Sequence, residues 1–130
     1  MTYQELNRYR HVKNRIRCIE FELNELAGLS AIRLDGMPHS RTPGDPVYQA
    51  YRKAEKLRKQ LVFQRQRAID ELLKLNDFIE SVDDPEMQNI LMARFVEGRT
   101  YEQIGESLFM HRTTVKRRIE IFLKDAHNAR

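Results

Sequence analysis

Residues 100–119, TYEQIGESLFMHRTTVKRRI, hold two short helical patterns that meet across a break. Thr100 and Gln103 have the spacing of a capping box, which predicts a helix from this point through Leu108. Gly105 lies inside that helix, where a small residue tolerates a close crossing by the next helix. A glycine inside a helix otherwise costs about 1 kcal/mol relative to alanine. The stretch therefore predicts a helix-turn-helix.

The break falls at Phe109 and Met110, where we expect the turn, with the Met110 side chain in the core. His111 takes the cap position of the last helix, 111–124. One side of this helix is apolar and consists of Val115, Ile119, Phe122 and Leu123. A recognition helix needs this division, because apolar residues hold it down while side chains near its N-terminus reach base edges. The candidate base-reading residues are Arg112, Thr113, Lys116 and Arg117.

Other side chains in this region suit contacts to DNA phosphates, which position a protein without reading sequence. They are Arg99, Thr100, Tyr101, Thr114, Arg118 and Lys124. Ahead of them, Asp84 at a capping position and Pro85 behind it predict the start of another helix, which Gly98 ends. Its apolar face is formed by Met87, Ile90, Leu91 and Phe95. We therefore expect residues 81–130 to form a three-helix DNA-binding domain.

The N-terminal part of the sequence predicts a long helix from about residue 2 to Ala27, which Gly28 ends. Its apolar seam repeats every three or four residues, at Tyr9, Val12, Ile16, Ile19, Leu23 and Leu26. Glycine and proline cluster in the following segment, about 28–46, which predicts a long loop.

A second long helix should begin at Asp45, a cap, and Pro46, and continue to about residue 80. Its seam consists of Ala50, Ala54, Leu57, Leu61, Ala68, Leu72, Leu75 and Ile79. Two such helices joined by a loop pack antiparallel most simply, so residues 1–80 should form a helical hairpin that serves as an oligomerisation or partner region. The expected fold class is all-α: this hairpin followed by the helix-turn-helix unit.

Antiparallel packing would place residues 8–17 beside roughly 56–65, and neither run contains an acidic side chain. The basic residues are Arg8, Arg10, Lys13, Arg15, Arg17, Lys56, Arg58, Lys59 and Arg65. They are either a solvated face or a second surface for nucleic acid or an acidic protein. Apolar residues away from the seams also need a second surface, either on the C-terminal unit or on another copy: Phe21, Val62, Phe63, Ile69 and Leu73. We expect a homodimer or a higher homo-oligomer.

Composition excludes several classes of protein. Hydrophobic residues make up 41% and charged residues 32%, too balanced for disorder and too polar for a membrane protein. The single cysteine, Cys18, gives no internal disulfide, and no signal-peptide pattern opens the sequence, so we expect a cytoplasmic protein. The four histidines lack metal-ligand spacing, and no phosphate-binding loop or nucleophile with a base is evident, so we expect neither an enzyme nor a cofactor.

The net charge is +4, but its placement is more informative. Residues 81–130 hold 8 Lys and Arg against 8 Asp and Glu, so this part is neutral overall. Four of its positive charges nevertheless lie close together, at Arg112, Lys116, Arg117 and Arg118. A local basic patch of this kind indicates an anionic partner.

RFVEGRTYEQIGESLFMHRTTVKRRIEIFLK resembles the sigma-70 region 4 type of helix-turn-helix. The shared pattern is Gly98 and Thr100, then Ile104, Gly105 and Leu108, then Thr114, Val115 and Arg118. Two positions differ: Phe109 stands where a residue tolerant of positive φ is usual, and His111 replaces a common serine cap. The whole chain is similar to phage regulators of the ArpU/RinA type. This resemblance implies activation of late genes for packaging and morphogenesis in a bacterial host. From the residue pattern we expect double-stranded DNA as the partner, and RNA polymerase is a second candidate partner, for the basic hairpin.

Other readings of the residues stay open. A DNA-packaging adaptor, similar to a small terminase subunit, would use the same helical module and a ring-forming hairpin. A sigma-like factor would bind RNA polymerase through its helix-turn-helix, although residues 1–80 resemble a coiled coil more than a promoter-melting domain. An all-helical assembly protein with a solvated basic helix would not require Thr100, Gly105 and Val115 to fall in register.

Overall fold

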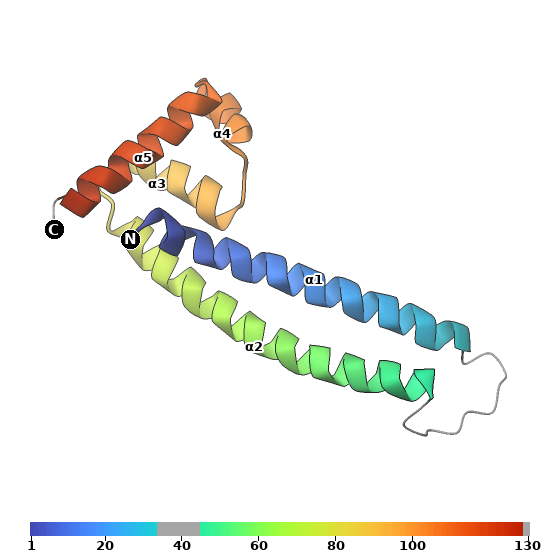
Figure 1. The fold of residues 1–130 in the computed structure, drawn as a ribbon. Helices are drawn as coiled ribbons and strands as arrows, with labels where there is room; N and C mark the ends of the chain where they lie inside the picture. Colours follow the sequence, from blue (N-terminus) through green and yellow to red (C-terminus); the bar gives the residue numbers. More distant parts are fainter. Residues whose placement is uncertain (34–44, 129–130) are drawn as a thin grey trace. The chain divides into compact units, whose positions relative to one another are not determined.

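The computed structural model describes residues 1–33 and 45–128, and every regular element in these ranges is helical (Figure 1). The elements are α1 (Tyr3–Arg33), α2 (Pro46–Glu80), α3 (Pro85–Leu91), the π-helical segment η1 (Met92–Val96), α4 (Tyr101–Leu108) and α5 (Arg112–Asn128). The predicted all-α fold, with long N-terminal helices followed by shorter ones, is confirmed. None of the helices in the described ranges is both long and apolar enough to cross a membrane.

Helix α1 corrects one prediction, because it passes through Gly28 and continues to Arg33. Gly28 has no left-handed backbone conformation, and nothing lies within 4 Å of the place where its Cβ would be. A glycine at such an open position lowers helix stability by only about 1 kcal/mol, which is not enough to end a long helix. The predicted loop at 28–46 therefore begins later than expected, and its central residues, 34–44, lie outside the described residues.

Helix α2 has the predicted bounds. Its start is capped by Asp45, whose Oδ1 accepts a hydrogen bond from the Val47 backbone N–H at 2.9 Å. At the other end, the Gln88 side-chain amide donates to the backbone carbonyls of Ile79 and Val82 at 3.2 and 2.8 Å. The Ile79 carbonyl also accepts from the Val82 backbone N–H at 3.1 Å, so Gln88 ties α3 to the turn that follows α2.

The chain divides into two compact units, each of which contains parts of α1 and α2. Unit 1 comprises Met1–His11 and Ala68–Arg130, and unit 2 comprises Val12–Arg67. This grouping differs from the predicted division after residue 80. The roles assigned to the two predicted parts, self-association or partner binding for 1–80 and DNA binding for 81–130, stay predictions. In unit 1 the first residues of α1 belong with the C-terminal helices.

Unit 2 is an antiparallel pairing of two helices with a small core. Ile19 of α1 packs with Leu57 and Leu61 of α2, and all three side chains are buried. Ile16, at the C-terminal end of the basic run, packs against the same cluster together with Leu23 and Leu26, so residues 56–65 lie beside the end of that run and the residues that follow it. Arg65 pairs with Glu20 at 3.4 Å instead of facing another base.

Unit 1 contains the larger core. Buried side chains from the end of α2, α3, η1, α4 and α5 meet there with Leu6 of α1, which is 0% exposed. Its other members are Leu75, Ile79, Val82, Met87, Ile90, Leu91, Phe95, Ile104, Val115 and Ile119. The apolar face predicted for the helix that begins at Asp84 is buried in it, at Met87, Ile90, Leu91 and Phe95.

Candidate nucleic-acid interface

Local capping sets the start of the three-helix region. Asp84 is the N-cap of α3, and its Oδ1 accepts a hydrogen bond from the Glu86 backbone N–H at 3.1 Å. Pro85 follows at the first helical position, where its missing N–H has no effect on the helix. Beyond η1, Gly98 adopts a φ of 74°, a left-handed conformation that favours glycine and ends the helix. The predicted start and stop are both confirmed.

The predicted capping box of α4 is also present. The Gln103 backbone N–H donates to Thr100 Oγ1 at 3.1 Å, and the Thr100 backbone N–H donates to Gln103 Oε1 at 3.0 Å. Each side chain therefore satisfies one backbone donor at the start of the helix. This reciprocal pair fixes where α4 begins and so where the following turn falls.

Gly105 is buried because the backbone of the turn lies directly against it. A Cβ on this residue would lie 2.4 Å from the Met110 carbonyl oxygen, and the Met110 N–H donates to the Gly105 carbonyl at 2.8 Å. The backbone nitrogen of Arg112, the first residue of α5, would lie 3.5 Å from the same Cβ. The close approach predicted at this glycine is thus made by the turn and the start of α5.

The turn itself places Phe109 in an unusual position. Its φ and ψ are 57° and 42°, the left-handed region, and its side chain is 98% exposed. Among the described residues other than glycine, this is the one with positive φ. The turn therefore keeps the ordinary helix-turn-helix geometry, with phenylalanine in the conformation that glycine usually adopts. Met110 is partly buried against the core, as predicted.

His111 caps α5 through its imidazole ring. Its Nδ1 accepts a hydrogen bond from the Thr113 backbone N–H at 3.3 Å and lies 2.8 Å from Thr113 Oγ1. The His111 carbonyl accepts from the backbone N–H groups of Thr114 and Val115 at 2.9 and 3.2 Å. At the predicted cap position, an imidazole nitrogen thus accepts the capping hydrogen bond that a serine hydroxyl would otherwise accept.

Helix α5 has one buried side and one polar side. Val115 and Ile119 are both 0% exposed, and Phe122 and Leu123 pack against the same core. The predicted base-reading side chains, Arg112, Thr113, Lys116 and Arg117, are all exposed. Among the described residues none of Arg112, Lys116 and Arg117 has a salt bridge. The helix therefore presents free cations near its N-terminal half while its opposite side is anchored, which is the arrangement that groove insertion requires.

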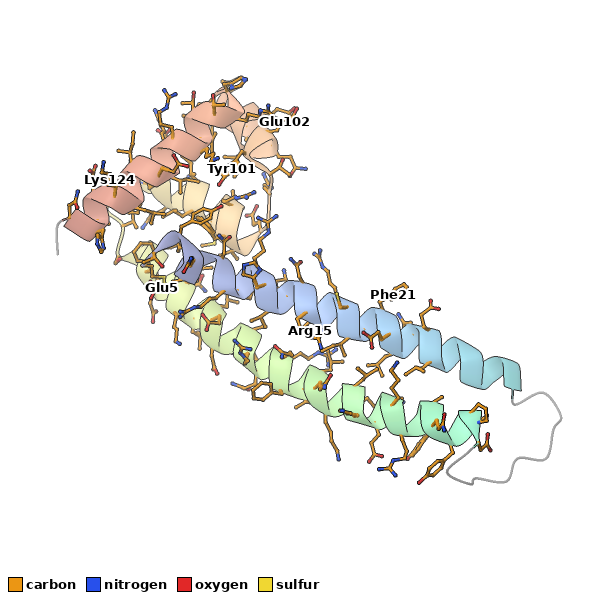
Figure 2. All side chains as sticks on the ribbon, in the orientation of Figure 1. Glu5, Arg15, Phe21, Tyr101, Glu102 and Lys124 are labelled. Atoms are coloured by element: carbon orange, nitrogen blue, oxygen red, sulfur yellow. The ribbon has the colours of Figure 1, made fainter. Side chains whose placement is uncertain are left out.

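The predicted phosphate-contacting residues differ in how much they are engaged within the protein. Arg99 pairs with Glu97 at 2.8 Å, Arg118 pairs with Glu86, and the Thr100 hydroxyl belongs to the capping box. Thr114 and Lys124 are exposed, and Lys124 lies in the second half of α5 (Figure 2). Exposed ion pairs are weak, so a phosphate can compete for either arginine. Their role at DNA stays a prediction.

Tyr101, the remaining member of that set, is half-buried in a cluster that includes the start of α1. Its hydroxyl lies 3.2 Å from the hydroxyl of Tyr3, and the Arg94 guanidinium carbon lies 4.0 Å above its ring centre. Arg94 also donates to the Arg99 carbonyl at 3.0 Å, while its buried Nε has no hydrogen-bond partner among the described residues. The cluster thus links the loop before α4 to the first residue of α4.

Tyr3 is held in this cluster by its own ring and by the start of its helix. The rings of Tyr3 and Phe95 meet edge to face, with centroids 5.9 Å apart and an interplanar angle of 78°. Thr2 and Glu5 form a second capping box, at 2.7 and 3.2 Å, which begins α1 at Tyr3. The hydrogen bond with Tyr101 lowers the pKa of Tyr3, whereas burial raises the pKa of Tyr101.

Sequence reasoning did not find Tyr3, Leu6 or Arg94 as parts of this region. The capping spacing of Thr2 and Glu5 was a readable signal for where α1 begins. No local pattern, however, indicates that the first turn of α1 packs against residues about a hundred positions later. The predicted second basic surface is exposed except for partial burial of Arg10 and Lys13, and Arg65 is engaged with Glu20. Its role also stays a prediction.

Residues 84–123, about a third of the chain, match the family model described as Sigma-70, region 4. The match begins at the Asp84 cap and ends within α5. Neither a curated protein nor a solved structure matches the chain. The family match and the anchored, basic α5 together identify a sigma-like helix-turn-helix of the DNA-binding type. The residues that α1 contributes to unit 1 lie outside the matched segment.

Proposed function

We propose that the protein is a sequence-specific double-stranded DNA-binding transcription activator of phage late genes, acting in the cytoplasm of the bacterial host as a homodimer. It binds DNA and has no catalytic role. The observation that carries the proposal is the division of α5, whose Val115 and Ile119 are fully buried while Arg112, Lys116 and Arg117 are exposed without salt bridges in the described chain. Guanidinium and ammonium groups placed in this way suit guanine edges in a major groove.

The late-gene role rests on the resemblance of the whole chain to phage regulators of the ArpU/RinA type. The sigma-70 region 4 match also favours RNA polymerase as a second partner. Co-purification with core polymerase in the absence of DNA would distinguish a sigma-like factor from a regulator that meets polymerase only at a promoter. A regulator should show no stable complex with polymerase until promoter DNA is added.

Selection from a pool of random duplexes, followed by salt titration of the best sequence, tests the DNA-binding proposal. Specific readout should enrich one motif, and a dimer should enrich it as two half-sites one or more helical turns apart. Binding that depends steeply on salt and enriches no motif would reduce the interface to phosphate contact. Absence of binding at low salt would contradict the proposal.

A DNA-packaging adaptor similar to a small terminase subunit is the second candidate. The exposed apolar residues on α2, among them Val62 and Phe63, favour it as much as they favour a dimer, because a ring also needs contacts between copies. The assembly state separates the two functions. A ring of many subunits in solution would favour packaging, and a dimer would favour regulation.

A further inference from the structure

One exposed stripe of α2 has the same spacing in both directions and opposite charges at the matching inner positions. It consists of Tyr51, Glu55, Arg58 and Val62, all in unit 2. Their spacings of 4, 3 and 4 residues place them within an arc of about 60°, since an α-helix turns by about 100° per residue. In order, the stripe is apolar, acidic, basic and apolar.

The four side chains are available to a partner. Tyr51 is 61% exposed and Val62 is 68% exposed, and Glu55 and Arg58 are exposed as well. Within the part of the chain that the structure describes, Glu55 and Arg58 have no salt bridge, whereas Arg65 on the same helix pairs with Glu20. The stripe lies about 110° around the helix from the seam that buries Leu57 and Leu61.

We propose that this stripe is the self-association surface of the protein, formed by α2 helices of two copies that pack antiparallel. The symmetry axis crosses midway between Lys56 and Leu57. Tyr51 then lies opposite the partner's Val62, and Glu55 lies opposite the partner's Arg58. Each contact occurs twice, so one stripe gives two apolar pairs and two ion pairs.

A second copy fits this stripe better than another protein does, because the stripe complements itself in both polarity and charge. Self-association would also add to the small core of unit 2. Among the described residues this core buries only Ile19, Leu57 and Leu61 as a cluster, because two helices alone share a single apolar seam. Such a contact is isologous and closes at two subunits, so it produces a dimer and not a ring. It is also short, and we expect a concentration-dependent dimer that binding to adjacent half-sites reinforces.

This inference rests on the homodimer of the proposed function, and its test uses the full chain without DNA. Failure of self-association is therefore distinguishable from failure of DNA binding. Sedimentation equilibrium should show dimerisation of the wild-type chain. Glu55→Arg and Arg58→Glu should each weaken it by about tenfold or more in Kd, because each places two like-charged pairs across the interface.

The decisive sample is an equimolar mixture of these two variants. One copy then carries two bases and the other two acids, so both ion pairs form again and a heterodimer should appear with nearly wild-type Kd. If either substitution weakened dimerisation only by altering its own helix, mixing would not restore association, because each variant chain has the same sequence in the mixture as alone. Helix content from circular dichroism should equal that of the wild type in every sample.

Two further variants test which face of α2 forms the contact between copies. Val62→Glu should weaken dimerisation, and Phe63→Glu should leave it unchanged, because Phe63 is similarly exposed at 62% but lies about 100° around the helix. A monomeric wild type, a ring, a mixture that fails to associate, or equal effects of Val62→Glu and Phe63→Glu would each overturn the proposal.

Discussion

The hydroxyl oxygens of Tyr3 and Tyr101 lie 3.2 Å apart, which joins the first turn of α1 to the first turn of α4. Tyr101 follows the Thr100 cap directly, and Arg94 lies over its ring. The start of the helix-turn-helix is thus held partly by a residue outside the segment that matches the sigma-70 region 4 family.

Tyr3→Phe should lower the free energy of unfolding by about 0.5–1.5 kcal/mol, the net value of a typical intramolecular hydrogen bond. The ring would still meet Phe95 edge to face, so the change isolates the hydroxyl. Urea unfolding of the full chain measures it. Tyr48→Phe is the control, because Tyr48 lies in unit 2 and contacts Arg52 through its ring, and equal effects of the two changes would contradict the prediction.

Leu6→Ala should destabilise unit 1 by about 2–5 kcal/mol, because it leaves a cavity in the core that holds the helix-turn-helix. The same substitution at Leu73, which is 58% exposed, should change stability by less than about 0.5 kcal/mol. Thermal unfolding followed by circular dichroism compares the two. If Leu6→Ala behaved like Leu73→Ala, α1 would have no part in the core.

Gly105→Ala should lower the free energy of unfolding, and Gly28→Ala should raise it. Alanine at Gly105 would place its Cβ against the Met110 carbonyl oxygen, and the resulting strain should cost about 1–3 kcal/mol. Alanine at Gly28 meets nothing within 4 Å and should stabilise α1 by up to about 1 kcal/mol. Chemical denaturation of both variants measures these changes. If Gly105→Ala stabilised the protein, the turn would lie farther from residue 105 than the structure shows.

Phe109→Gly should raise the free energy of unfolding by about 1 kcal/mol. Phenylalanine holds a φ of 57° there, a conformation that costs residues other than glycine about 1–2 kcal/mol, and its 98% exposed ring loses little packing when removed. The midpoint of urea unfolding reports the change. A loss of stability would instead reveal a contact of the ring that compensates for the backbone.

Arg117→Ala should weaken binding to cognate DNA by about 1–3 kcal/mol and have a smaller effect on random DNA, if Arg117 reads a base. Lys124→Ala provides the comparison, because a phosphate contact should weaken both complexes equally. Fluorescence anisotropy at one fixed salt concentration measures the four affinities. If Arg117→Ala lowered the affinity for cognate and random DNA equally, Arg117 would contact a phosphate and not a base.

Local signals predicted most of the helix-turn-helix. The Asp84 cap, the Thr100 capping box and the Gly98 stop involve residues at most a few positions apart, so their chemistry is readable in order along the chain. The same holds for α5, whose buried and exposed sides follow from helical periodicity. The positions of the candidate base-reading residues on the exposed side could therefore be predicted.

Contacts between distant segments could not be predicted in the same way. The seam of α1 indicated burial at Val12 and Ile19 but not their partners, so the pairing of Ile19 with Leu57 and Leu61 was not predicted. Neither periodicity nor capping indicated that Leu6 shares a core with Val115. The extension of α1 beyond Gly28 was missed because glycine is a weak helix terminator when its backbone conformation stays helical.

The shared core of Leu6 and Ile119 also determines when this protein can fold. A ribosome makes Leu6 first and Ile119 more than a hundred residues later, so α1 must wait for the C-terminal helices before its first turn is buried. Contacts of such high sequence separation close late and slow folding. A nascent or truncated chain would expose Leu6 together with Leu75 and Ile79, which makes incomplete copies prone to aggregation. The DNA-binding unit should accordingly mature only after translation of the segment through α5 is complete.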